Sequence, residues 1–128
     1  MKRDPFFRNH LIRDAIHAAL YAKMKRDPRV VVLGEGAGMK MRFDAQEILR
    51  DFPERVVTLP ISENGNTDFA VGLALGGMVP VVDIITADFI YRAFDSIANT
   101  CAKMGEVGEA RTMVIRAEFM TGGPTTGQ

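Results

Sequence analysis

Residues 30–38 read VVVLGEGAG, a short apolar run of mostly β-branched side chains followed by a glycine-rich turn. A strand that is covered on both faces shows such an unbroken apolar pattern, because neither of its faces meets solvent. Before it, apolar residues recur at spacings of three and four over residues 9–25, which predicts an amphipathic helix with Asn9 as its N-cap. Asp27 and Pro28 end that helix. The segment therefore predicts a helix that leads into a buried strand.

The same alternation of elements continues along the chain. Helical patterns at residues 44–53, 62–75 and 88–101 alternate with apolar strand-like runs at residues 56–59, 79–85 and 112–116. Asp44 and Ser62 are the expected caps, and Gly72 and Gly76 share a helix face that another backbone could approach closely. Short strands alternating with helices predict an α/β fold, a parallel sheet sandwiched by helices.

Composition excludes several classes of protein. The chain has 128 residues, 47% of them hydrophobic, and its sixteen basic and sixteen acidic side chains cancel. This balance gives no electrostatic reason to expect nucleic acid or a membrane as a partner, and no apolar run approaches the ~20 residues of a membrane span. Cys101 is the single cysteine, so we expect no internal disulfide, a buried structural thiol and a reducing, cytoplasmic location.

The end of the chain is a loop-like sequence. Residues 120–128 read MTGGPTTGQ and follow closely on the expected strand at residues 112–116. Domains seldom finish on such a loop just past a core strand. We therefore expect residues 1–128 to form one domain that is incomplete at its C-terminus.

Three loops follow the expected strands, at residues 34–38, 60–65 and 86–89. Binding sites of parallel sheets form at the carboxyl ends of the strands. The first loop would match a dinucleotide-binding fingerprint only with glycine at position 39, which is Met39. A tight turn that positions Glu35 is the simpler interpretation, and nucleotide binding is the alternative.

The second loop places a carboxylate at the start of a helix. Residues 59–65 read LPISENG, and a helix N-terminus would keep Glu63 ionised. Spacing alone leaves two interpretations open, because Glu63 could satisfy the first-turn amides or carry out catalysis. His10 and His17 lie seven residues apart without ligand partners, so no metal site is expected.

The chain resembles the β subunit of 2-oxo acid dehydrogenase E1 components, which contains a transketolase-like pyrimidine-binding domain. The most specific match is PISENG at residues 60–65, in register with PVV at 80–82 and DF at 88–89. Further matches are LGE at 33–35, RVV at 55–57, AVGLA at 70–74, and the Asn99 and Ala102-Lys103 landmarks. Transketolases and deoxyxylulose-phosphate synthases share some of these landmarks, but the Asn-x-x-Ala-Lys segment favours the E1 family.

The resemblance implies a role for each matching residue. In this family the module binds the aminopyrimidine ring of thiamine diphosphate, and Glu63 matches the catalytic glutamate that hydrogen-bonds ring nitrogen N1′. Phe89 matches the aromatic residue that stacks on the ring. Ile61 and Ile85 match positions that line it, and Glu35 matches an acidic residue beside the catalytic glutamate, a proton-relay or coupling partner.

The resemblance also implies partners, since the Gly-Asp-Gly motif that holds Mg²⁺ and the diphosphate is missing. We expect an E1 α-type subunit to carry it, so the chain would be inactive alone. The expected function is a β-subunit, or a fragment of one, for oxidative decarboxylation of a 2-oxo acid with acyl transfer to a lipoyl carrier protein, with self-association through exposed apolar surface. The alternatives are a noncatalytic truncated partner or scaffold subunit, and a split subunit like that of transketolase or deoxyxylulose-phosphate synthase. Gly36 and Asp68 depart from the family pattern, the latter on a helix face expected at a subunit contact.

Overall fold

The computed structural model describes residues 5–37, 46–107 and 111–118, with side chains described from residue 12 onward. In these residues the strands are β1 (Val30–Gly34), β2 (Val56–Thr58), β3 (Val79–Ile84) and β4 (Val114–Ala117). They form one parallel sheet in the order β2-β1-β3-β4. The helices are α1 (Pro5–Arg26), α2 (Gln46–Asp51), α3 (Glu63–Leu75) and α4 (Ala102–Glu106). The short helical segments are η1 (Pro53–Arg55), η2 (Ala87–Ala93) and η3 (Ser96–Cys101).

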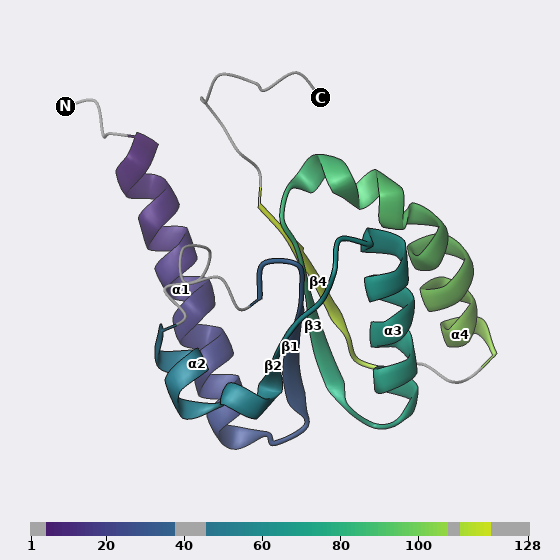
Figure 1. The fold of residues 1–128 in the computed structure, drawn as a ribbon, viewed down its shortest axis with the longest axis horizontal. Helices are drawn as coiled ribbons and strands as arrows, with labels where there is room; N and C mark the ends of the chain where they lie inside the picture. The colour runs from purple at the N-terminus through teal and green to yellow at the C-terminus, as the bar shows by residue number, and fades with distance from the viewer. Residues whose placement is uncertain (1–4, 38–45, 108–110, 119–128) are drawn as a thin grey trace.

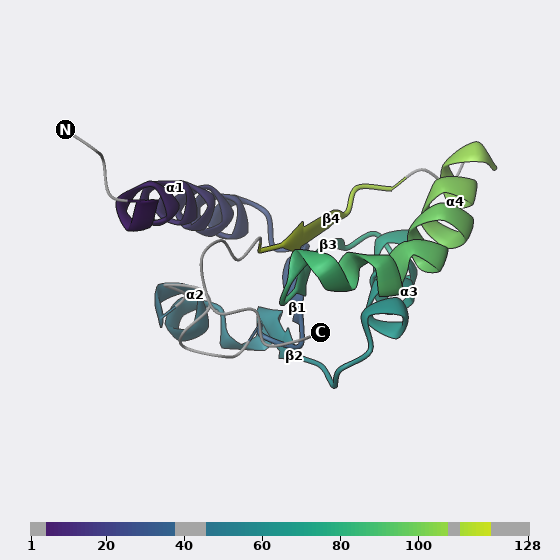
Figure 2. The same cartoon turned by 90° about the horizontal axis from the view of Figure 1, so that it is seen from above.

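Helices cover both faces of the sheet, with α1 and α2 on one side and α3 and α4 on the other (Figures 1 and 2). The side chains of β1 alternate between two buried clusters. Val30 and Val32 pack with Met24 and Ile48 beneath α1 and α2, whereas the other two apolar residues of β1 pack with Ala70 beneath α3. Burial on both faces explains why β1 is apolar at every position. The expected α/β fold is confirmed.

One local expectation was wrong, one was met in position only, and one found no partner within the described chain. The first helix begins at Pro5, so Asn9 lies inside it; proline suits a first helical position because its φ is already helical. Ser62 occupies the N-cap position of α3, but its hydroxyl makes no capping hydrogen bond. Gly72 receives no close backbone, since a Cβ built there meets nothing of the described chain within 4 Å. Asp44 lies outside the described residues.

The helical stretch expected at residues 88–101 changes its winding along its length. It starts as the 3₁₀ segment η2, passes through the π-helical η3 and ends as α4. No helix among the described residues is long and apolar enough to cross a membrane.

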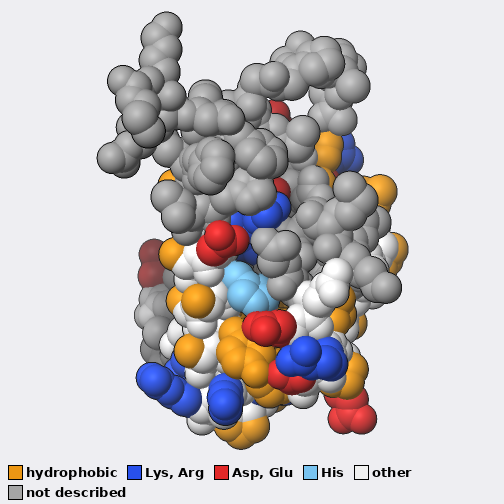
Figure 3. All heavy atoms as spheres, turned by 90° about the vertical axis from the view of Figure 1, so that its left-hand side faces the viewer, with side chains coloured by type: hydrophobic (Ala, Val, Ile, Leu, Met, Phe, Trp, Pro, Cys, Tyr) orange, Lys and Arg blue, Asp and Glu red, His pale blue; other side chains and the backbone are white. Residues whose placement is uncertain are grey.

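The contact between α1 and α2 combines the apolar cluster around Met24 and Ile48 with polar side chains nearer the surface. Figure 3 shows acidic and basic side chains interspersed on the described part of this face. Asp51 of α2 accepts hydrogen bonds of 2.7 Å from Tyr21 Oη of α1 and from Nε of its neighbour Arg50. Chiefly the Arg50 guanidinium, and then the Tyr21 hydroxyl, lower the pKa of the Asp51 carboxyl to about 2.

Acidification should therefore weaken the attachment of α2. Because the pKa of Asp51 is lower in the folded chain than in the unfolded chain, its contribution is complete above about pH 4 and is lost as the pH falls toward about 2. Urea midpoints measured across this range should fall less steeply for Asp51→Asn than for the wild type. Asp14→Asn, at an exposed position of α1, is the control and should follow the wild type. Equal slopes for Asp51→Asn and wild type would contradict the prediction.

Candidate active site

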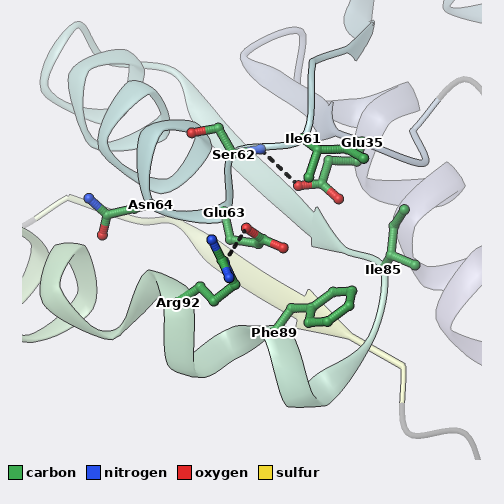
Figure 4. A pocket seen from close by; sticks show the side chains of 8 residues that line it. All are labelled: Glu35, Ile61, Ser62, Glu63, Asn64, Ile85, Phe89 and Arg92. Atoms are coloured by element: carbon green, nitrogen blue, oxygen red, sulfur yellow. Dashed lines mark hydrogen bonds and ion pairs between the residues drawn. The ribbon is translucent and has the colours of Figure 1, made fainter. Parts of the chain in front are cut away.

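A pocket of about 750 Å³ opens at the carboxyl edge of the sheet. It is lined by Glu35, Ile61, Ser62, Glu63, Asn64, Ile85, Phe89 and Arg92 (Figure 4). All five residues that the family resemblance singled out are among them. The structure therefore brings these five side chains into one cavity, while their chemical roles stay predictions.

The parallel sheet explains this convergence. Glu35 directly follows β1 and Ile85 directly follows β3, and these two strands pair in register up to Gly34 and Asp83. Parallel neighbours end at the same edge, so the residues that follow them lie close together. The loop after β2 reaches the same edge and carries Glu63 as the first residue of α3.

Backbone hydrogen bonds hold the first two loops together. The Leu59 N–H donates to the Gly34 carbonyl at 3.0 Å. The Ser62 N–H donates to Glu35 Oε1, also at 3.0 Å, and the Glu35 side chain is buried. The role of the glycine turn is thus to deliver a carboxylate to the second loop.

The Glu63 carboxylate points into the pocket. Its residue is 5% exposed, and the carboxylate accepts no hydrogen bond from the first-turn amides of α3 in the described chain. The loop before it is held by Asn66, whose side chain donates to the Pro60 carbonyl at 3.1 Å. Thr67 Oγ1 donates to the Glu63 carbonyl at 2.7 Å. These contacts fix the backbone on both sides of the Glu63 side chain, and the chemical role of the carboxylate stays a prediction.

Arg92 is a pocket residue that sequence reasoning missed. Its Nε lies 3.4 Å from Glu63 Oε2, and its side chain is 74% exposed whereas that of Glu63 is 6% exposed. Phe89 and Arg92 lie three residues apart in η2, and side chains at this spacing eclipse in a 3₁₀ segment. The three-residue spacing from Phe89 was the one sequence signal that could have identified Arg92. It points to the pocket only when the segment is known to be wound as a 3₁₀ helix.

A second missed contact joins the two walls of the pocket. Ser96 is fully buried and donates from its backbone N–H (3.2 Å) and its hydroxyl (2.7 Å) to Asn64 Oδ1. The hydroxyl also lies 3.0 Å from the Asn64 carbonyl. This contact links η3 to the start of α3, so it fixes the helical segment that carries Phe89 relative to Glu63. No sequence pattern pairs residues 64 and 96.

The pocket combines apolar walls with two buried acids, Glu35 and Glu63. Ile61, Ile85 and Phe89 supply the apolar surface, and Glu63 supplies an acceptor at one edge. This arrangement suits a flat heteroaromatic ring, whose faces need apolar contact and whose ring nitrogen needs one polar partner. No group of three or more potential metal-ligating side chains occurs in the described ranges.

Several known proteins are similar to this chain. The family model described as "Transketolase, pyrimidine binding domain" matches residues 10–122. Pyruvate dehydrogenase E1 component subunit beta-1, mitochondrial, of Arabidopsis thaliana is 39% identical over 97 residues, which is 72% of this chain and 26% of that protein. 2-Oxoisovalerate dehydrogenase subunit beta, mitochondrial, of Dictyostelium discoideum is 40% identical over 91 residues, 70% of this chain and 25% of that protein.

A solved structure of a "Split gene transketolase, inactive beta4 tetramer" matches with a TM-score of 0.66 and 25% identity. The match covers 82% of this chain and 33% of that one. The chain thus spans about a quarter of the length of the curated relatives it matches and a third of the solved chain.

Proposed function

Because this chain belongs to the transketolase pyrimidine-binding domain family, we propose that its pocket binds the aminopyrimidine ring of thiamine diphosphate, with Glu63 as the catalytic group. The observation that carries the proposal is the position of Glu63, a buried carboxylate that faces the same cavity as Phe89 and Ile85. The pocket fits the ring, since it offers apolar surface for the ring faces and one acceptor for a ring nitrogen.

Five of the residues that line the pocket then have a defined task. Thiamine diphosphate, when bound, supplies the electron sink for decarboxylation of a 2-oxo acid. Glu63 holds the hydrogen bond to ring nitrogen N1′ and the proton shared there. Phe89 stacks on the ring, Ile61 and Ile85 exclude water from its edges, and Glu35 is the acidic partner on the neighbouring loop.

At the level of the whole protein, we propose a β-type subunit of a 2-oxo acid dehydrogenase E1 component. The names of the relatives, a pyruvate and a 2-oxoisovalerate dehydrogenase, support this class of substrate. An α-type subunit would hold Mg²⁺ and the diphosphate, and a lipoyl carrier protein would accept the acyl group. Phe69, Tyr91 and Phe94 are 50%, 79% and 60% exposed and are the proposed contacts to other subunits. The single cysteine supports a reducing compartment such as the cytoplasm.

The likeness to a split-gene transketolase favours a second candidate, a split transketolase subunit. Mixing the chain with a candidate α-type subunit, with and without thiamine diphosphate and Mg²⁺, separates the possibilities. We expect a heteromeric complex in size-exclusion chromatography, a cofactor-dependent thermal shift, and decarboxylation of a 2-oxo acid. Ketol transfer between sugar phosphates instead would indicate a transketolase, and a complex without any turnover would indicate a noncatalytic partner.

Removing the stacking ring should weaken binding of the aminopyrimidine. A base-like ring stacked on an aromatic side chain contributes about 1–3 kcal/mol, so Phe89→Ala should raise the Kd of 4-amino-5-hydroxymethyl-2-methylpyrimidine by about 5- to 150-fold. The measurement is an NMR titration of the chain. Phe94→Ala is the matched control, because Phe94 is exposed and does not line the pocket. Equal losses for the two variants would contradict the assignment.

A further inference from the structure

Arg92 lies beside the carboxylate to which the proposed function gives the central role. Among the described residues that line the pocket it is the one cation. Its Nε lies 3.4 Å from Glu63 Oε2. The contact is asymmetric, because the arginine side chain is 74% exposed and the glutamate side chain 6% exposed. A solvent-facing guanidinium therefore reaches inward to a buried carboxylate.

The ion pair engages one oxygen of the Glu63 carboxylate and leaves the other oxygen available to a ligand in the pocket. Arg92 approaches Oε2, while the other oxygen of Glu63 points toward the space between Phe89 and Ile85 (Figure 4). That space is where the aminopyrimidine ring would lie. The ion pair and the proposed hydrogen bond to N1′ thus use different oxygens and are compatible with each other.

Two features of the backbone place the guanidinium there. The 3₁₀ winding of η2 aligns Arg92 with Phe89 on one edge of the segment. The hydrogen bonds from Ser96 to Asn64 attach the next segment to the start of α3, one residue after Glu63. Arg92 is therefore attached to a part of the fold that is fixed relative to the carboxylate it contacts.

The second acid of the pocket is held differently. Glu35 Oε1 accepts a hydrogen bond from a backbone N–H, that of Ser62, which cannot rotate away. The Glu63 carboxylate accepts no such bond from the backbone of the described residues. Its orientation thus depends on a side-chain partner, and Arg92 is that partner.

We propose that Arg92 is a positioning residue, which holds Glu63 through Oε2 so that the other oxygen faces the aminopyrimidine. The proposal rests on the proposed function of the pocket. Because the guanidinium of this ion pair is largely exposed to solvent, the expected effect of its loss on pyrimidine binding is a change of about threefold rather than abolition.

The contact itself is tested without any ligand. In the full chain with ¹³C-labelled glutamate side chains, Arg92→Gln should shift or broaden the Glu63 carboxyl resonance, because the carboxylate loses its restraint. Lys103→Gln is the matched control, since it removes the same charge from an exposed position on α4 outside the pocket. A Glu63 resonance that is unchanged in Arg92→Gln would overturn the proposal.

The consequence for binding is tested by NMR titration with 4-amino-5-hydroxymethyl-2-methylpyrimidine. We expect Arg92→Gln to bind about threefold more weakly than wild type, Arg92→Lys to recover part of the loss, and Lys103→Gln to equal wild type. Unchanged binding by Arg92→Gln would overturn the positioning role. Tighter binding would overturn it too, because it would show that Arg92 competes with the ring for the pocket. Failure of the wild type itself to bind would refute the proposed function, and the positioning role with it.

Discussion

Replacing Glu63 with glutamine is expected to lower turnover of the reconstituted α–β complex by about 10²–10⁴-fold, the contribution typical of a positioned acid or base. Glutamine has nearly the same size and shape, so the loop from Pro60 to Asn66 and its hydrogen bonds should persist. An amide, however, cannot hold the proton shared with ring nitrogen N1′. The loss should therefore fall on kcat, with the thermal stability of the complex little changed.

The control for this variant is Glu106→Gln, which removes the same charge from an exposed position on α4. It should leave kcat at the wild-type value. Glu63→Asp keeps the carboxylate but shortens the side chain. If the charge of the carboxylate matters more than the length of the side chain, Glu63→Asp should retain more activity than Glu63→Gln. Undiminished turnover of Glu63→Gln would remove Glu63 from the chemistry.

Of the substitutions proposed for this chain, Gly34→Ala should produce the largest loss in the free energy of unfolding. Gly34 ends β1 with a φ of +145°, and a Cβ added there would lie 2.2 Å from the Asp83 carbonyl oxygen of β3. Both the backbone conformation and the contact are unfavourable for alanine, and together they should lower the free energy of unfolding by about 3 kcal/mol. Because the backbone of β3 cannot move without disturbing the centre of the sheet, little relief is available. Chemical denaturation of the isolated chain measures the loss.

Gly72→Ala is the matched control and should act in the opposite direction. Gly72 lies inside α3, and a Cβ there meets nothing of the described chain within 4 Å. Alanine is a better helix former than glycine, so the variant should gain up to about 1 kcal/mol. If Gly34→Ala matched the wild type in stability, the close pairing of β1 with β3 at this point would be wrong.

The order of elements could be predicted from the sequence because the signals are local. The apolar run at residues 30–33 is explained by the two clusters that β1 joins. The placement of Glu35, Glu63 and Phe89 at one edge follows from a general property of parallel sheets, that successive strands end on the same side. The family resemblance then selected these residues from among the others in the same loops.

The missed features depend on geometry that a local pattern does not determine. Arg92 reaches the pocket because η2 is wound as a 3₁₀ segment, whereas the sequence predicted an ordinary helix from residue 88. The contact between Asn64 and Ser96 spans 32 residues and joins two elements whose packing is a tertiary property. Asn9 was assigned as a cap because the apolar periodicity begins there, but the helix extends back to Pro5.

The proposed function depends on a hydrogen bond between Glu63 and ring nitrogen N1′ of an aminopyrimidine bound in this pocket. The decisive measurement is ¹⁵N NMR of thiamine labelled at N1′, titrated with the wild-type chain and with Glu63→Gln. We expect the N1′ resonance to move on binding to the wild type, and Glu63→Gln to lose most of this change while Phe89 still holds the ring. An N1′ resonance that moves equally with both chains, or with neither, would show that the bond does not form.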